Sequence, residues 1–162
     1  MQPEAEEGAL ARERAVALLL ALRAHDLVTT RDVLAEASTE GRGGLVELVH
    51  ALVRGAVAMV HEVGWDLAGT LSVKLEARPD GQAGAPEVEL ARELVLTAVQ
   101  READGDPAGA AEFAGRVVDA RPDAVLVWGL VTAAQLIEQL LGVCRRRGVP
   151  VPGWLSMVDN CG

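Results

Sequence analysis

The chain has very few aromatic residues: its 162 residues include one phenylalanine, three tryptophans and no tyrosine. Half of the sequence is nevertheless hydrophobic, so the large apolar residues are nearly all aliphatic. β-Sandwiches and barrels draw on aromatic and β-branched side chains, whereas alanine, leucine and valine suit closely packed helices. The composition therefore favours a helical fold, and the chain is long enough for one domain with its own core.

Cysteine and positive charge are also scarce. The two cysteines, Cys144 and Cys161, cannot build a disulfide framework. Fifteen basic residues face 24 acidic ones, which gives a formal net charge of −9. The basic stripe by which nucleic-acid binders neutralise phosphates is missing. The one basic cluster, at 145–147, ends an expected helix, where cations are favoured. We therefore expect no nucleic-acid partner.

The sequence lacks a long uninterrupted apolar run. The longest, from 124 to 141, contains Gln135, Glu138 and Gln139, which makes it too short and too polar for a confident membrane span. The arginine triplet after this run leaves a span open as the alternative. Three glutamates stand among the first seven residues, where a secretory signal carries positive charge. We expect a cytoplasmic protein with no membrane contact.

Helical periodicity dominates the rest of the sequence. It predicts a mainly α, single-domain bundle of about six helices over residues 1–148, followed by a C-terminal tail at 149–162. The expected helices span about 3–25, 31–37, 45–63, 86–104, 107–120 and 122–147. In the third, apolar residues recur every three or four positions, as on one buried helix face. They are Leu45, Leu48, Val49, Leu52, Val53, Ala56 and Val60.

Several residues indicate where these helices begin and end. Pro107 and Pro122 suit the first helical turn, where a missing N–H costs little. Thr29 or Thr30 is expected to cap the second helix, and Gly64 to end the third.

The tail cannot continue the last helix, because Pro150 and Pro152 lack the N–H that a helix needs. We expect the tail to be mobile unless Trp154 or Leu155 docks on the domain.

Residues 70–77, TLSVKLEA, break the helical pattern. Apolar and polar residues alternate there, which is the period of a strand. A single strand cannot satisfy its own backbone groups. Three interpretations stay open: the segment pairs with another part of the chain, it pairs with a second copy, or it is helical.

The sequence between 93 and 136 resembles one helical hairpin of the tetratricopeptide family and the start of a second. The residues that carry the resemblance are Gly105 and Asp106 at the turn, the small Ala110, Phe113 one place early, the closing Pro122 and Trp128. The resemblance implies a surface that binds a peptide or protein partner. The alternative is an ordinary antiparallel helix pair, since stable arrays need about three repeats and the N-terminal half shows none. Either way, Ala110, Ala114 and Val117 are expected to face the core.

Glu47 and His50 form a Glu-x-x-His pair on one face of the third expected helix, as in di-metal helical bundles. His61 lies on the same face and makes this trio the candidate metal site, or a site for acid–base chemistry. Arg54 stands between the histidines and opposes a cation. The alternative is a solvated, salt-bridged helix face.

The last expected helix offers a second candidate site. Trp128, Thr132, Gln135 and Gln139 share one narrow face among aliphatic residues. They could line a pocket for a small ligand between helices, or meet water or a partner at the surface.

The sequence contains no phosphate-binding glycine loop, no Cys-x-x-Cys and no Gly-x-Ser-x-Gly. We therefore expect no cofactor. The favoured function is a small acidic adaptor or regulatory protein that binds a protein partner, as a homodimer, without catalysis. The alternative is a helical small-molecule-binding protein or enzyme that uses one of the two candidate sites.

Overall fold

The computed structural model describes residues 3–64, 86–121 and 123–160. Over these residues the elements are all helical, so the expectation of a mainly α bundle is confirmed. They are α1 (Pro3–Arg23), α2 (Leu27–Ser38), α3 (Arg42–Val63), α5 (Pro86–Ala103), α6 (Pro107–Asp119), α7 (Ala124–Arg147), the 3₁₀-helix η2 (Gly153–Leu155) and α8 (Ser156–Asn160). The expected strand at 70–77 lies outside the described residues.

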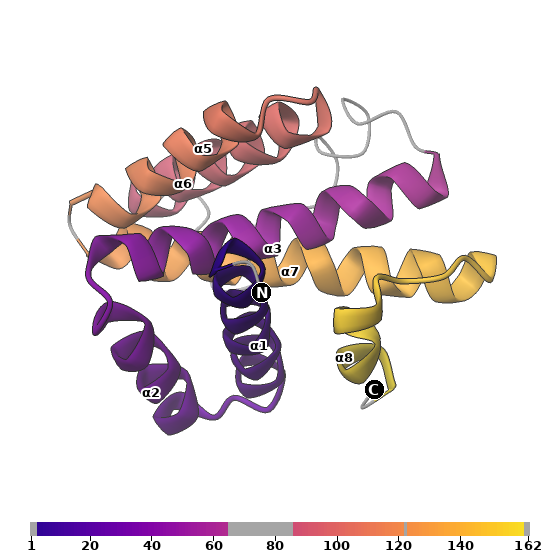
Figure 1. Cartoon of the computed structure of the whole chain (residues 1–162), viewed down its shortest axis with the longest axis horizontal. Coiled ribbons are helices and arrows are strands. Elements are labelled where there is room, and N and C mark those ends of the chain that lie inside the picture. The colour runs from indigo at the N-terminus through magenta and orange to yellow at the C-terminus, as the bar shows by residue number, and fades with distance from the viewer. Residues whose placement is uncertain (1–2, 65–85, 122, 161–162) are drawn as a thin grey trace.

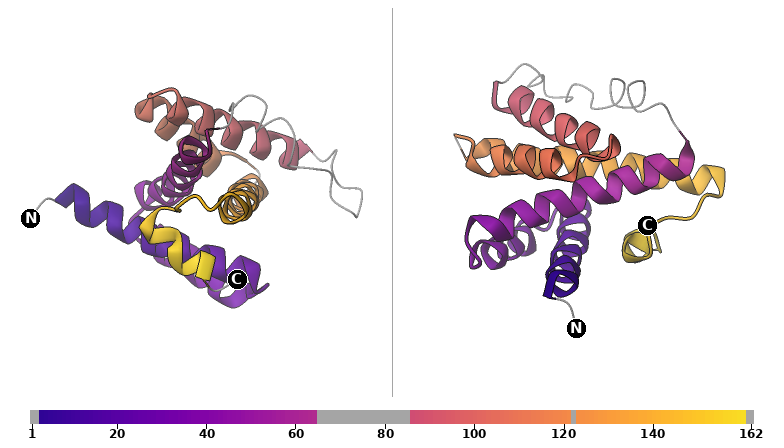
Figure 2. Two further views of the ribbon diagram at one scale, coloured as in Figure 1. Left: turned by 90° about the vertical axis from the view of Figure 1, so that its right-hand side faces the viewer. Right: turned by 45° about the horizontal axis from the view of Figure 1, so that its top comes forward.

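The helices form three layers (Figures 1 and 2). The two longest, α3 and α7, lie side by side in the middle layer. The α5–α6 hairpin covers one side of this pair. The α1–α2 hairpin and α8 lie on the other side, with α1 crossing beneath α3. Because α3 contacts α1, α5, α6 and α7, it is the axis of the fold.

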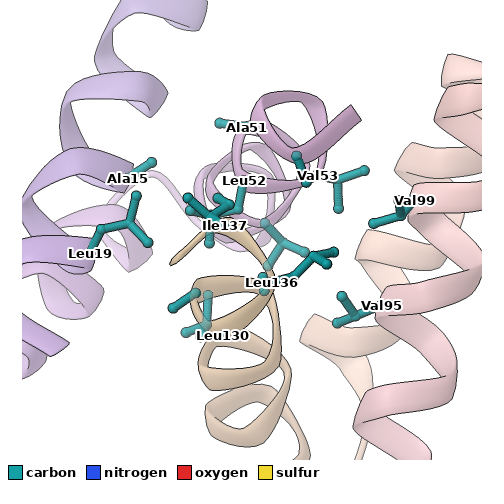
Figure 3. Close-up of a cluster of buried hydrophobic side chains, with 14 of the residues drawn as sticks. Ala15, Leu19, Ala51, Leu52, Val53, Val95, Val99, Leu130, Leu136 and Ile137 are labelled. Atoms are coloured by element: carbon teal, nitrogen blue, oxygen red, sulfur yellow. The ribbon is translucent and has the colours of Figure 1, made fainter. Parts of the chain in front are cut away.

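Aliphatic side chains from four helices meet in the core (Figure 3). Leu19 of α1, Leu52 of α3, Ile137 of α7 and Val95 of α5 are each at most 1% exposed. In the expected stripe of α3 only Leu45 is partly exposed. Burial of such a side chain stabilises the fold by roughly 1.5–3 kcal/mol.

The hairpin containing α6 packs as expected. Ala110, Ala114 and Val117 are fully buried. Val117 also rests on Gly129 of α7: a Cβ at Gly129 would lie 2.7 Å from Cγ1 of Val117. The small residue therefore allows α6 and α7 to approach each other closely.

Three helices end in the same way, with a left-handed residue and two reversed backbone hydrogen bonds. Gly105 (φ 84°) ends α5 and Gly148 (φ 66°) ends α7. At the end of α1 the left-handed residue is His25 (φ 56°). The N–H of Asp26 donates to the carbonyl of Ala21 (2.8 Å), as in a Schellman motif. A histidine thus takes a position that usually belongs to glycine.

The expected cap of α2 was wrong. The helix begins at Leu27, and Asp26 is its N-cap, with its side chain accepting from the N–H of Thr29 (3.0 Å). The Thr29 hydroxyl also donates to Asp26 (2.6 Å). Leu27 and Val28 form the first turn but are each 71% exposed, so no buried apolar stripe marks where this helix begins.

The start of α3 also differs from the expectation. It begins at Arg42, three residues before Leu45, because Gly41 reverses the chain with φ 79° and ψ −162°. Gly64 ends the helix in a left-handed conformation, as expected. The last helix was expected to begin at Pro122, which lies outside the described residues; it begins at Ala124, with Asp123 as its N-cap.

The C-terminal segment, residues 149–160, packs on the helical body. Leu155 and Val158 are 0% exposed, and Trp154 is half-buried. Trp154 and Leu155 thus dock on the domain, which is the condition under which the tail was not expected to be mobile.

α3 and α7 are long and apolar enough to span a membrane by length and composition alone. More than half of the apolar window of each helix is buried inside the fold. Core helices of soluble proteins have the same properties.

Candidate functional site

Trp154 lines two hollows on the surface of the protein. The first, the His50 hollow, has a volume of about 530 Å³ and lies between the N-terminal half of α1 and α3. Ala51 and Ala58 contribute its apolar lining. Its polar groups are Arg12 from α1 and Glu47, His50 and Arg54 from α3.

The second, the Met157 hollow, has a volume of about 410 Å³ and is more apolar. Val16 of α1, Trp154 and Met157 line it, and Met157 is 60% exposed. Arg12 borders both hollows, as does Trp154. The two hollows and the residues between them form one continuous surface, called here the Trp154 surface.

His50 makes a short polar contact beside this surface. Its Nε2 lies 2.6 Å from Oε1 of Glu102, which comes from α5. The two side chains are only 14% and 16% exposed. Nε of Arg54 lies 3.7 Å from the same carboxylate oxygen. Glu102 thus fixes the orientation of the imidazole at the edge of the hollow.

The metal trio expected from the sequence does not assemble. Among the described residues, no group of three histidine, cysteine, aspartate or glutamate side chains could hold a metal ion. His50 turns to Glu102 on another helix, while His61 is exposed and lines neither hollow of the Trp154 surface. The interpretation of this α3 face as solvated therefore holds for His61. It fails for His50, because α5 covers the His50 side chain.

The second candidate site is divided between two environments. Gln135 and Gln139 are exposed and line a third hollow of about 630 Å³ between α1 and α7, together with Arg23 and Glu138. Thr132 is buried, and neither it nor the half-buried Trp128 lines this hollow. The four residues therefore do not line one pocket.

The close packing of Trp154 against α3 was not predicted from the sequence. Gly55 lies in the middle of α3, and a Cβ placed there would be 2.8 Å from Cζ2 of Trp154 and 3.2 Å from Cδ1 of Leu155. Glycine in a helix interior is unfavourable by about 1 kcal/mol relative to alanine. That unfavourable residue was the available signal that another group approaches α3 closely.

Polar contacts hold the same segment at its far end. Nη1 of Arg23 donates to the backbone carbonyl of Val158 (2.8 Å), and Nη2 donates to Glu138 of α7 (2.7 Å). Arg145 pairs with Asp159 (2.7 Å). The first residue of the expected basic cluster therefore anchors the C-terminal segment.

Cys144 is buried in α7, as expected of a small core residue. Burial raises the pKa of its thiol, and the carboxylates of Asp159 and Glu62 raise it further. A raised pKa disfavours the thiolate, which is the reactive form of a cysteine side chain.

The α5–α6 hairpin, which resembles a tetratricopeptide unit, lines none of these three hollows. Comparison of the chain with protein-family models, with curated proteins and with solved structures gave no match. Function therefore has to be inferred from the chain's own residues, above all from the Trp154 surface.

Proposed function

We propose that this protein is a non-catalytic adaptor or regulatory module, which binds a protein partner through the Trp154 surface. The observation that carries the proposal is the pair of hollows that share Trp154 and Arg12, the second of them also lined by the exposed Met157. Tryptophan, methionine and arginine are the residues that protein interfaces favour. Methionine also adapts its shape to a partner.

The interior of the described fold supports a binding role over a buried active site. Its buried polar side chains are Arg14 and Thr132, and Arg14 pairs with Glu40. The rest of the described core is apolar. A ligand pocket inside the bundle would instead need several inward polar groups to orient its ligand.

The experiment compares two substitutions of exposed apolar residues. M157E places a charge on the Trp154 surface, and V127E places the same charge on α7, where Val127 is 51% exposed and lines none of the three hollows. Proteins captured from native lysate by each variant are quantified by mass spectrometry. We expect that at least one partner is captured by the wild type and by V127E but is not captured by M157E. Retention of every partner by M157E would contradict the proposed surface.

A second candidate function has one observation in its favour, namely the imidazole of His50 held by Glu102 beside an open hollow. A carboxylate that orients a histidine is a common feature of general bases. The alternative is therefore a small-molecule-binding protein or enzyme that uses the His50 hollow. A fragment screen by NMR tests this alternative. Ligands that bind the wild type but not H50A would support it, and the absence of any such ligand would contradict it.

The expected homodimer stays a prediction. Leu27 and Val28, adjacent and 71% exposed, offer an apolar contact for a second copy. Light scattering should give twice the chain mass of 17.0 kDa for the wild type and a lower mass for V28E. A mass near 17.0 kDa for the wild type would contradict the dimer.

A further inference from the structure

We infer that the third hollow, between α1 and α7, is a second binding site, and that its ligand is a small neutral molecule with an apolar ring and an amide-like edge. None of the described residues that line this hollow also lines the Trp154 surface. The inference therefore goes beyond the proposed function and does not depend on it.

The hollow has the size and the position of a ligand site. Its volume of about 630 Å³ exceeds that of either hollow of the Trp154 surface. Ligand pockets often lie between the helices of a bundle and have volumes of about 300–1,000 Å³. The space between α1 and α7 is therefore large enough for a small organic molecule.

Aliphatic side chains from both helices form an apolar wall of the hollow. Leu19 and Leu22 contribute from α1. Val131 and Ala134 contribute from α7. Leu19 and Ala134 are part of the core, whereas Leu22 and Val131 are only half-buried. A ligand that covered the half-buried pair would remove apolar surface from water, which favours a ring or another apolar body.

The Arg23 guanidinium and the Glu138 carboxylate at this hollow are paired with each other. Nη2 of Arg23 donates to Glu138 (2.7 Å), while Nη1 donates to the backbone carbonyl of Val158 (2.8 Å). Because the two charges neutralise each other, a charged ligand would lose its hydration without gaining a free counter-charge from this pair. The pair also fixes the edge of the hollow before a ligand binds, as in pre-formed pockets.

The side-chain amide of Gln135 is available to a ligand. This side chain is exposed, lines the hollow and makes no hydrogen bond or ion pair within the described part of the chain. Gln139 lines the hollow one turn further along the same face of α7. A glutamine amide presents an acceptor oxygen beside an NH₂ donor. It therefore matches a ligand edge with a neighbouring donor and acceptor, as in a carboxamide or a lactam.

His25 adds an exposed imidazole to the edge of the hollow, at the end of α1. Its backbone is left-handed (φ 56°), a conformation that residues other than glycine seldom adopt. Strained positions of this kind are concentrated at ligand-binding and active sites. Among the described residues the imidazole has no hydrogen-bond partner, so it is available to contact the ligand.

Benzamide, benzoate and benzylamine test the inference, because they share one ring and differ in the charge of the head group. Each compound is titrated into the isotopically labelled full chain, and NMR records the shifts of the backbone amides. We expect benzamide to cause saturable shifts at residues 19–25 and 131–139 and to bind roughly fivefold more tightly than either charged compound. Absence of these shifts, or equal or tighter binding of a charged compound, would overturn the inference.

Three variants locate the site. V131W places a large side chain in the hollow and should abolish the benzamide shifts. V127W is the matched control, since Val127 lies one turn earlier, is 51% exposed and lines none of the three hollows. Q135L removes the amide at an exposed position and should weaken benzamide binding roughly fivefold.

The spectra without ligand show which variants are folded, and Q135L decides the test if V131W is not. Unchanged benzamide binding in either folded variant of the hollow would overturn the inference. That result would leave the proposed function intact, because M157E tests a separate surface.

Discussion

Trp154 lies so close to Gly55 that a Cβ at position 55 would be 2.8 Å from Cζ2 of its indole. The two residues are far apart in the sequence: Gly55 belongs to the central helix α3, and Trp154 lies within the 3₁₀-helix η2 of the C-terminal segment. α3 keeps a glycine in its interior although alanine there would favour the helix. The contact therefore defines where the segment docks.

G55A should destabilise the protein relative to G142A. Both substitutions add the same helix propensity, but the Cβ at Gly142 meets only the end of the Arg146 side chain, at 3.4 Å. The clash at Gly55 is overpacking, which costs about 1–3 kcal/mol. Urea denaturation measures the difference in the free energy of unfolding between the two variants. Equal stability would show that the indole is not seated on α3.

G41A should cost about 1–3 kcal/mol of stability, since Gly41 has a backbone conformation that is open almost only to glycine (φ 79°, ψ −162°). The neighbouring G43A is the control, because a Cβ there meets nothing within 4 Å. Thermal unfolding of both variants checks this. A melting temperature of G41A equal to that of G43A would refute the assigned turn.

The His50–Glu102 pair should show coupling in a double-mutant cycle of H50A and E102A. Both side chains are mostly buried, so loss of either one leaves the other without its partner. We expect an interaction energy of about 1 kcal/mol. H61A, at an exposed position of the same helix, should change stability by less than about 0.5 kcal/mol. Additive effects of H50A and E102A would contradict the pairing.

The cap of α2 should make stability depend on pH. Hydrogen bonds from Thr29 hold the pKa of Asp26 below its ordinary value. The folded chain therefore binds this proton less tightly than the unfolded chain, so the ionised cap stabilises above the unfolded pKa of about 3.9. This stabilisation is lost as the pH falls through the lower folded pKa.

D26N keeps the capping oxygen without the charge. Between about pH 5 and 3 the wild type should lose more stability than D26N, because only the wild type must protonate its cap. Melting temperatures across this pH range test the difference. If the melting temperatures of the two proteins fell in parallel as the pH was lowered, the Asp26 carboxylate would not be the cap of α2.

The sequence predicted what depends on local pattern. Helix periodicity and the residues Pro107 and Gly64 act within one or two turns, so the span of α6 and the end of α3 agree with expectation. The start of α2 was not predicted correctly. Its first turn is exposed, so its apolar residues do not show the spacing of a buried helix face.

The candidate site depends on contacts between distant residues, and these were not predictable from local pattern. His50 meets Glu102 from another helix, 52 positions away. The Glu-x-x-His spacing placed two side chains on one face correctly but could not show that α5 covers His50. In the same way, Trp128 and Gln135 share a helix, yet only Gln135 lines the hollow beside α1.

Hydrogen exchange of backbone amides most directly tests the claim that the C-terminal segment docks on α1 and α3 as a unit separate from the helical core. Amides of residues 155–158 should exchange through a local opening, at least about a hundredfold faster than the buried amides of α3, while α3 stays protected. G55A should increase exchange in the segment only. Equal protection of the segment and α3 would show that the segment opens only when the whole domain unfolds, and would contradict the account.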